Sequence, residues 1–277
     1  MMNRILIFTV VLLMSACGSL KTKTAPGGES LNQLPQTTVA TGAESQDQLL
    51  LATLWYQKSA EMRALYYQCY ANAETALLKN LAVAQGDKTP AVVLDIDETV
   101  LDNSPFQGWQ VLENRNFSDE SWTRWVELGM AGALPGALDF TRFADSLGVV
   151  VFYVSNRKTT EIAPTLENMK RLGFPGADSS HLLLKESESS KVARRSRIES
   201  THEILLLVGD NLADLDAVFE KRGTDNGFSD ADRMRGLFGT RYIVLPNPMY
   251  GTWLSELLKQ AEGDSNRDKL IRTIVGF

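Results

Sequence analysis

The stretch that decides the fold is AVVLDIDETVLD, residues 91–102. Its apolar start, without a polar break, suits a strand that is buried on both faces, as the strands of parallel sheets are. Ligands of such sheets bind beyond the carboxyl ends of the strands, where Asp95 and Asp97 would emerge. The stretch therefore points to chemistry by carboxylates, although an ordinary strand that runs into an Asp-rich turn would give the same pattern.

Later segments would bring further polar side chains to the same edge of the sheet. Apolar runs at 149–154 and 204–208 read as two more strands, and each is followed at once by polar residues. A lysine stands where a helix is expected to begin, between these two strands. The candidate side chains from these segments are Ser155, Asn156, Lys191, Asp210 and Asp214.

From residue 91 onward, apolar strands alternate with helical patterns, and this alternation predicts a doubly wound parallel sheet in an α/β fold. Residues 47–90 are expected to form an N-terminal helical region of one or two helices, because 48–84 contains no proline or glycine. Further strands are expected at 182–184 and 242–245, and further helices at 137–147, 160–172 and 254–271.

Two carboxylates, a hydroxyl, a lysine and a further acid, in this order, resemble the four motifs of the haloacid dehalogenase superfamily of phosphohydrolases. The resemblance implies a phosphatase domain over 91–277, with a small, mainly α-helical second domain inserted at about 103–133. It also implies Mg²⁺ as cofactor, a hard cation that carboxylate oxygens suit. The implied metal ligands are Asp95, the backbone carbonyl of Asp97, and Asp210.

The same residue types fit phosphoryl transfer. Asp95 is expected to attack phosphorus and form an aspartyl-phosphate. Asp97 is expected to protonate the leaving oxygen and then to take a proton from the attacking water. Asp214 would support the site from outside the ligand set, or be a solvated residue in the first turn of a helix. The phosphoryl oxygens would be held by Ser155, the amide of Asn156 and Lys191.

The residue inventory argues against other phosphatase chemistries. The two histidines, His181 and His202, stand in no pattern suited to a phosphohistidine nucleophile or a zinc cluster. A cysteine phosphatase needs an arginine six residues after its nucleophile, but Thr75 holds that place after Cys69. A G-x-S-x-G elbow is also missing from the sequence. The carboxylate mechanism is the one that remains.

The amino terminus predicts where the protein works. Residues 1–16 have a positive start and an apolar run too short to span a bilayer, and small residues precede Cys17. This resembles a bacterial lipoprotein signal with Cys17 as the lipidated residue; a plain secretory signal is the alternative. Residues 17–46 then read as a flexible tether. The expected location is the outer membrane, with the enzyme facing the periplasm or the outside.

Longer motifs narrow the resemblance. D-I-D-E-T-V-L-D-N-S-P, F-S-x-E-S-W-T-x-W, S-N-R, L-L-L-K-E-S-E-S-S-K, V-G-D-N-L-A-D and L-P-N-P-M-Y-G are similar to the class C acid phosphatases, the lipoprotein e family of 5′-nucleotidases. That family implies a ring of the substrate between Trp122 and Tyr250, although Trp122 and Trp125 could instead both face a core. Its pattern offers Lys185 as well as Lys191, and the S-x-K setting favours Lys191.

We therefore expect a lipid-anchored, Mg²⁺-dependent phosphomonoesterase acting on nucleoside 5′-monophosphates, nicotinamide mononucleotide among them. The alternatives are a broad acid phosphatase without base preference and a non-catalytic surface lipoprotein that binds a ligand such as haem. With 28 basic and 34 acidic residues, the net charge of −6 disfavours a nucleic-acid polymer as partner. The expected partners are a small phosphomonoester and the membrane, through the lipid anchor alone; a homodimer is left open.

Overall fold

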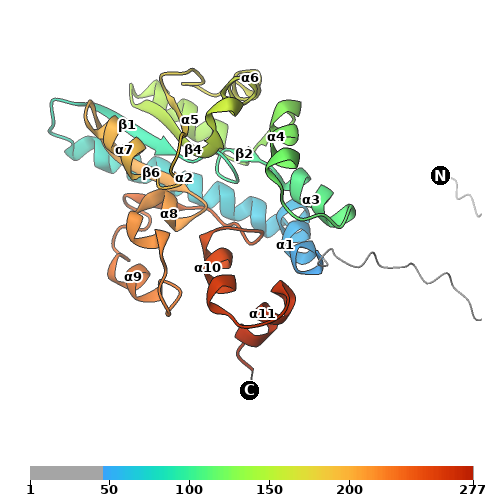
Figure 1. Cartoon of the computed structure of the whole chain (residues 1–277). Helices are drawn as coiled ribbons and strands as arrows, with labels where there is room; N and C mark the ends of the chain where they lie inside the picture. The colour runs from blue at the N-terminus through green and yellow to red at the C-terminus, as the bar shows by residue number, and fades with distance from the viewer. Residues whose placement is uncertain (1–45, 277) are drawn as a thin grey trace, which may run out of the picture. The chain divides into compact units, whose positions relative to one another are not determined.

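The structure is a computed structural model that describes residues 46–276 (Figure 1). The predicted signal peptide at 1–16, the predicted lipidated Cys17 and all of the predicted tether except Gln46 lie outside the described residues. None of the helices in the described range combines the length and the apolar character needed to cross a bilayer.

The centre of the described chain is a sheet of five parallel strands in the order β5-β4-β1-β6-β7. The strand that begins the decisive stretch, β1, is the middle strand, with β4 on one side and β6 on the other. The strands are β1 (Thr89–Leu94), β4 (Val150–Lys158), β5 (Leu182–Lys185), β6 (His202–Gly209) and β7 (Tyr242–Val244). Each of the five strands predicted from the sequence is therefore present.

Helices cover both faces of this sheet. Side chains alternate between the two faces along each strand, so the apolar residues of one strand contribute to both core clusters. Val92 and Leu94 of β1 pack into one core cluster, while Ala91 and Val93 pack into the other. The first cluster includes side chains of α2 (Ala60–Val83), α5 (Ala137–Ser146) and α6 (Ile162–Leu172), and the second includes side chains of α7 (Val192–Glu199) and α8 (Leu212–Leu215). The predicted doubly wound α/β fold is confirmed.

The N-terminal region consists of two helices, α1 (Asp47–Lys58) and α2. Ser59 separates them in an extended conformation, and its hydroxyl accepts a hydrogen bond of 3.1 Å from the backbone N–H of Met62. A serine at this position satisfies one of the free N–H groups at the start of α2, which favours a new helix over a continuous one.

The insertion after the first motif is mainly helical, as predicted. It contains α3 (Ser104–Leu112) and α4 (Asp119–Leu128), with a two-stranded antiparallel pair at its base, β2 (Leu101–Asp102) and β3 (Gly132–Ala133). Three short elements complete the α/β part: η1 (Thr159–Glu161), η2 (Ala217–Glu220) and α9 (Phe228–Arg233).

The single terminal helix predicted at 254–271 is wrong. The chain forms two helices, α10 (Thr252–Gln260) and α11 (Asn266–Thr273), drawn in red in Figure 1. Gly263 between them has φ +154°, where side-chain-bearing residues are strained, and the hydroxyl of Ser265 caps α11 by accepting from the N–H of Asp268 at 3.1 Å. In the sequence, Ala261 is the only apolar side chain between Leu258 and Leu270, and the turn residues Gly263, Asp264 and Ser265 mark the break that this prediction overlooked.

Candidate active site

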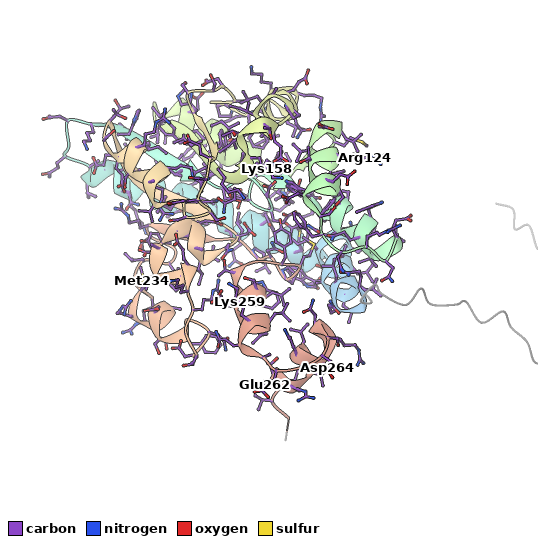
Figure 2. All side chains as sticks on the ribbon, viewed as in Figure 1. Arg124, Lys158, Met234, Lys259, Glu262 and Asp264 are labelled. Carbon is purple, nitrogen blue, oxygen red and sulfur yellow. The ribbon has the colours of Figure 1, made fainter. Side chains whose placement is uncertain are left out.

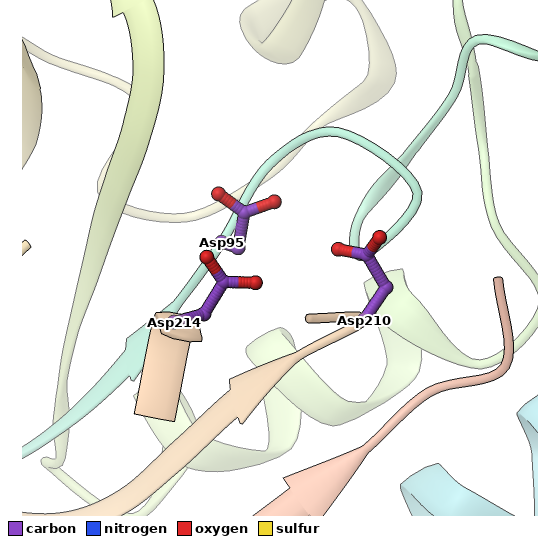
Figure 3. Close-up of side chains that lie close together, drawn as sticks. All are labelled: Asp95, Asp210 and Asp214. Carbon is purple, nitrogen blue, oxygen red and sulfur yellow. The ribbon is translucent and has the colours of Figure 1, made fainter. Parts of the chain in front are cut away.

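Three carboxylates meet at the carboxyl edge of the sheet (Figure 3). Asp95 follows β1, Asp210 follows β6 and Asp214 lies in α8; one oxygen of each lies within 4.8 Å of the others. β1 and β6 are neighbours, and the N–H of Asp95 donates to the carbonyl of Val208 at 2.9 Å. Parallel pairing therefore brings together acids that are far apart in the sequence.

Gly209 allows Asp214 to enter this cluster. A Cβ at position 209 would lie 2.7 Å from Cβ of Asp214 and 2.8 Å from its Oδ2. The same Oδ2 accepts a hydrogen bond of 3.1 Å from the N–H of Asn211, which fixes the first turn of α8. Asp214 is thus held inside the cluster, and its other oxygen, Oδ1, is paired with Lys191.

Lys191 is the cation that the structure places against these acids. It lies at the start of α7, is 3 % exposed, and forms ion pairs with Asp95 and, at 2.8 Å, with Asp214. Burial acts to lower the pKa of Lys191, but the charges of Asp214 and Asp95 outweigh it and raise that pKa. Lys185, at the end of β5, lines the surrounding cavity instead. The geometry thus favours Lys191 over Lys185 as the lysine at the reacting centre.

One lysine does not balance three clustered acids, of which Asp95 is buried and the other two are half-buried. Burial raises the pKa of Asp95 to about 7; Lys191 opposes this shift, while Asp214 and Asp97 add to it. Burial, followed by repulsion from Asp214 and Asp95, raises the pKa of Asp210 well above its usual range. A hard divalent cation would relieve this repulsion, and carboxylate oxygens are the donors it prefers. The residues present fit such a cation, with Asp214 as a further candidate ligand beside Asp95 and Asp210.

The carboxylate of Asp97 has different neighbours. Its Oδ1 accepts hydrogen bonds from Arg157 at 2.8 and 3.0 Å and from the amide of Asn103 at 2.9 Å. Its Oδ2 accepts from the hydroxyl of Ser155 at 3.3 Å. The side chain of Asp97 is therefore held outside the acid cluster, next to the predicted phosphate-binding serine.

Arg157 is the functional candidate to which the sequence analysis assigned no role. Its side chain is 2 % exposed, and its guanidinium binds Asp97 along one edge and donates to the hydroxyl of Thr165 at 2.9 Å along the other. The ring of Trp122 stacks over it, with the guanidinium carbon 5.6 Å from the ring centroid. The sequence did contain a signal for this residue, since Arg157 completes the S-N-R motif. Its role was not predicted because its partners come from separate elements of the chain.

The loop that follows Asp97 is fixed by buried tyrosines of α2. The hydroxyl of Tyr66 donates to the carbonyl of Glu98 at 2.5 Å, and that of Tyr70 to the carbonyl of Thr99 at 2.6 Å. Glu98 has φ +56°, a strained conformation for a residue with a side chain. The Thr99 hydroxyl in turn donates to Asp210 at 3.2 Å, which links the first motif to the last.

The remaining phosphate-binding candidates lie beside this network. Ser155 is fully buried in β4, while Asn156 is exposed and lines the cavity. Arg194 of α7 donates to the carbonyl of Ser155 at 2.6 Å, to Oδ1 of Asn156 at 2.7 Å and to the carbonyl of Ser190 at 3.0 Å. This arginine, also missed by the sequence analysis, joins the S-N-R segment to the turn before Lys191.

The acids open into a cavity of about 600 Å³. Both predicted ring-binding residues, Trp122 of α4 and Tyr250 in the loop before α10, line it. Trp125 instead packs against the first core cluster and donates its indole N–H to Asn103 at 2.8 Å. The two tryptophans of α4 therefore do not share one environment, which contradicts the alternative that both face the core.

The comparisons with known proteins agree with this geometry. Residues 15–253 match the family model described as HAD superfamily, subfamily IIIB (acid phosphatase), where HAD stands for haloacid dehalogenase. The chain belongs to this family, which confirms the predicted class of enzyme, an acid phosphatase. Within it, the chain is 39 % identical to the class C acid phosphatase from Bacillus anthracis, with a TM-score of 0.78 over 84 % of this chain and 98 % of that one. A second structure of that protein, with tungstate bound, has 38 % identity and a TM-score of 0.79 at the same coverage.

Curated plant proteins are more distant relatives. A stem 31 kDa glycoprotein of Glycine max is 29 % identical over 57 % of this chain and 58 % of its own length. Acid phosphatase 1 of Solanum lycopersicum is 28 % identical over 57 % of each chain. The match thus spans less than two thirds of the length of these curated relatives.

Proposed function

We propose that this chain is a Mg²⁺-dependent phosphomonoesterase that hydrolyses nucleoside 5′-monophosphates through an aspartyl-phosphate. The observation that carries the proposal is the cavity itself, because Asp95 and Lys191 line the same space as Trp122 and Tyr250. The tungstate-bound relative supports an oxyanion site in this fold, since tungstate is a tetrahedral oxyanion like phosphate.

In the first step, an oxygen of Asp95 attacks phosphorus and the ester bond to the leaving oxygen breaks. Lys191, held against Asp95 and Asp214, carries the positive charge that faces the phosphoryl oxygens. The cation, when bound by Asp95 and Asp210, would neutralise charge on the same oxygens. The hydroxyl of Ser155, buried next to Asp97, would be a further donor to these oxygens.

Asp97 then performs the proton transfers. It gives a proton to the leaving oxygen and later accepts one from the water that hydrolyses the phosphorylated Asp95. Hydrogen bonds from Arg157 and Asn103 hold the Asp97 carboxylate in place before the reaction. Little conformational entropy is therefore lost when Asp97 reaches its reactive position. The buried hydrogen bonds of Tyr66 and Tyr70 hold the backbone on which Asp97 stands.

The substrate ring is proposed to lie between Trp122 and Tyr250. Trp122 already stacks on Arg157 with one face and contacts Phe106 edge-on, with ring centroids 5.3 Å apart. These contacts fix the indole before a ligand arrives, which reduces the entropy lost on stacking. A broad acid phosphatase without base preference is the second candidate, and it is favoured by the names of the relatives, which state acid phosphatase and no nucleotide.

We also propose that Cys17 carries a lipid and anchors the enzyme to the outer membrane. Support comes only from the sequence, in the apolar run and small residues that precede this cysteine. The third expectation, a non-catalytic binder of haem, has no support from the family to which the chain belongs.

The test is hydrolysis of a panel of phosphomonoesters by the full chain and by Asp95→Asn. Nucleoside 5′-monophosphates should have a higher kcat/KM than glycerol phosphate, a chelator should abolish activity, and added Mg²⁺ should restore it. Asp95→Asn should bind tungstate yet release less than a few per cent of the wild-type phosphate, because an amide cannot form the acyl phosphate. Equal kcat/KM for ringed and ringless esters would leave the broad phosphatase, and turnover by Asp95→Asn would refute covalent catalysis.

A further inference from the structure

The C-terminal helical pair carries an apolar face that the protein core does not cover. Leu254, Leu257 and Leu258 of α10 have the spacing of one helix face, and Leu270 lies on α11. Neither α10 nor α11 contains a buried residue, and neither core cluster of the described chain includes a leucine of the pair. The four leucines are half-buried, so part of their apolar surface stays accessible in residues 46–276, and a bound apolar group could cover it.

Part of this face lines the cavity of the active site. Leu254, Leu258 and Leu270 line the same cavity as Asp95 and Lys191. Leu49 of α1 also lines it. Figure 1 shows α10 and α11 as a hairpin with α1 beside it, and Figure 2 places Glu262 and Asp264 at the turn that joins the two helices. The polar residues are at the outer turn, while the leucines border the cavity.

The cavity thus has three chemically distinct parts. The acids and Lys191 form a charged end, and Trp122 and Tyr250 contribute aromatic rings. Leu49, Leu254, Leu258 and Leu270 form an aliphatic part, which we call the leucine wall. A nucleoside monophosphate offers a phosphoryl group for the charged end and a ring for the aromatic part, but no aliphatic group for the leucine wall.

We propose that the leucine wall binds the aliphatic chain of a phosphomonoester, so that alkyl and acyl-chain phosphates with one free phosphoryl group form a further substrate class. The leucine wall and Asp95 line one continuous cavity. A ligand on the wall can therefore place a phosphoryl group at Asp95, which is why the proposed occupant is a phosphomonoester. The volume of about 600 Å³ lies within the usual range for small-molecule sites. The proposal rests on the phosphomonoesterase chemistry proposed above, but not on the preference for nucleotides.

The reaction is the same hydrolysis with a different leaving group. Asp95 forms the bond to phosphorus, the bond between phosphorus and the alkyl oxygen breaks, and that oxygen takes the proton of Asp97. Water then attacks the phosphorylated Asp95, gives its proton to Asp97 and releases inorganic phosphate. The products are a long-chain alcohol and phosphate, and no further reactant is needed.

The test is the dependence of kcat/KM on chain length for the full-length protein, with alkyl phosphates from butyl to dodecyl below their aggregation concentrations. Each methylene that reaches the leucine wall should raise kcat/KM about two- to fourfold, as expected for burial of an apolar group. Leu258→Gln and Leu270→Gln should lower the ratio of dodecyl to butyl kcat/KM by about tenfold. Leu51→Gln is the matched control, because Leu51 is 75 % exposed on α1 and does not line the cavity.

Melting temperatures of all three variants identify any loss of folding. A flat chain-length profile in the wild type overturns the proposal, as does a steep profile that Leu258→Gln and Leu270→Gln leave unchanged. A flat profile with concentration-dependent self-association would assign the face to a second copy of the chain. If butyl phosphate and nucleotides both remain intact, the phosphatase function fails; if they are hydrolysed and only the chain-length effect is missing, the leucine wall alone is refuted.

Discussion

Replacing Arg157 by Gln removes the strongest partner of the Asp97 carboxylate. The ion pair has a shortest distance of 2.8 Å, and its side chains are 2 % and 18 % exposed. Loss of one partner of a buried pair costs about 3–5 kcal/mol, and the lower end applies because Asp97 keeps its bonds to Asn103 and Ser155. We therefore expect the free energy of unfolding to fall by about 3 kcal/mol, which urea denaturation measures.

The same change should slow catalysis. A positioned general acid contributes about 10²- to 10⁴-fold to the rate, and an Asp97 without Arg157 should lose about 10- to 100-fold of this in kcat. Arg157→Lys should recover only part of the rate, because an ammonium cannot reproduce the two-pronged contact. Tungstate binding should persist, since Asp95 and Lys191 are unchanged.

A double-mutant cycle with Asp97→Asn decides whether Arg157 acts through Asp97. In the Asp97→Asn background, Arg157→Gln should have almost no further effect on kcat, giving a coupling of about 1 kcal/mol or more. Additive losses, within about 0.5 kcal/mol, would show that Arg157 does not position Asp97 and would refute the reasoning.

Four further substitutions test the rest of the site and the lipid anchor. Asp210→Ala should raise the Mg²⁺ concentration needed for half-maximal activity, because it removes one carboxylate from the acid cluster; an unchanged Mg²⁺ titration would exclude Asp210 as a ligand. Trp122→Ala and Tyr250→Ala should each lower kcat/KM for nucleoside monophosphates about tenfold, a stacking loss of about 1–3 kcal/mol, with a smaller effect on glycerol phosphate. Equal losses on both esters, with a lower melting temperature, would assign these rings to packing. Cys17→Ser should abolish incorporation of labelled fatty acid; wild-type protein recovered unlabelled from the soluble periplasm would contradict lipidation.

The sequence by itself determined the sheet and the type of chemistry. The apolar runs that end in Asp95, Ser155 and Asp210 predicted parallel strands and a shared catalytic edge, because buried strands need apolar residues on both faces. The order of acids, hydroxyl and lysine then indicated a phosphohydrolase of the haloacid dehalogenase superfamily, the longer motifs indicated an acid phosphatase, and the family match agrees. These features are local in the chain or fixed by motif order, so they can be read without coordinates.

Only the tertiary structure decided how the polar groups are paired and where the last helix breaks. Arg157 meets Asp97 and Trp122 across three elements, and no spacing in the chain encodes that contact. Asp214 joins the acid cluster because Gly209 has no side chain to block it. One helix was predicted across Gly263, yet a glycine backbone conformation and a serine cap produce two. Periodicity reports which residues are apolar, whereas pairing and chain reversal depend on which elements fold against one another.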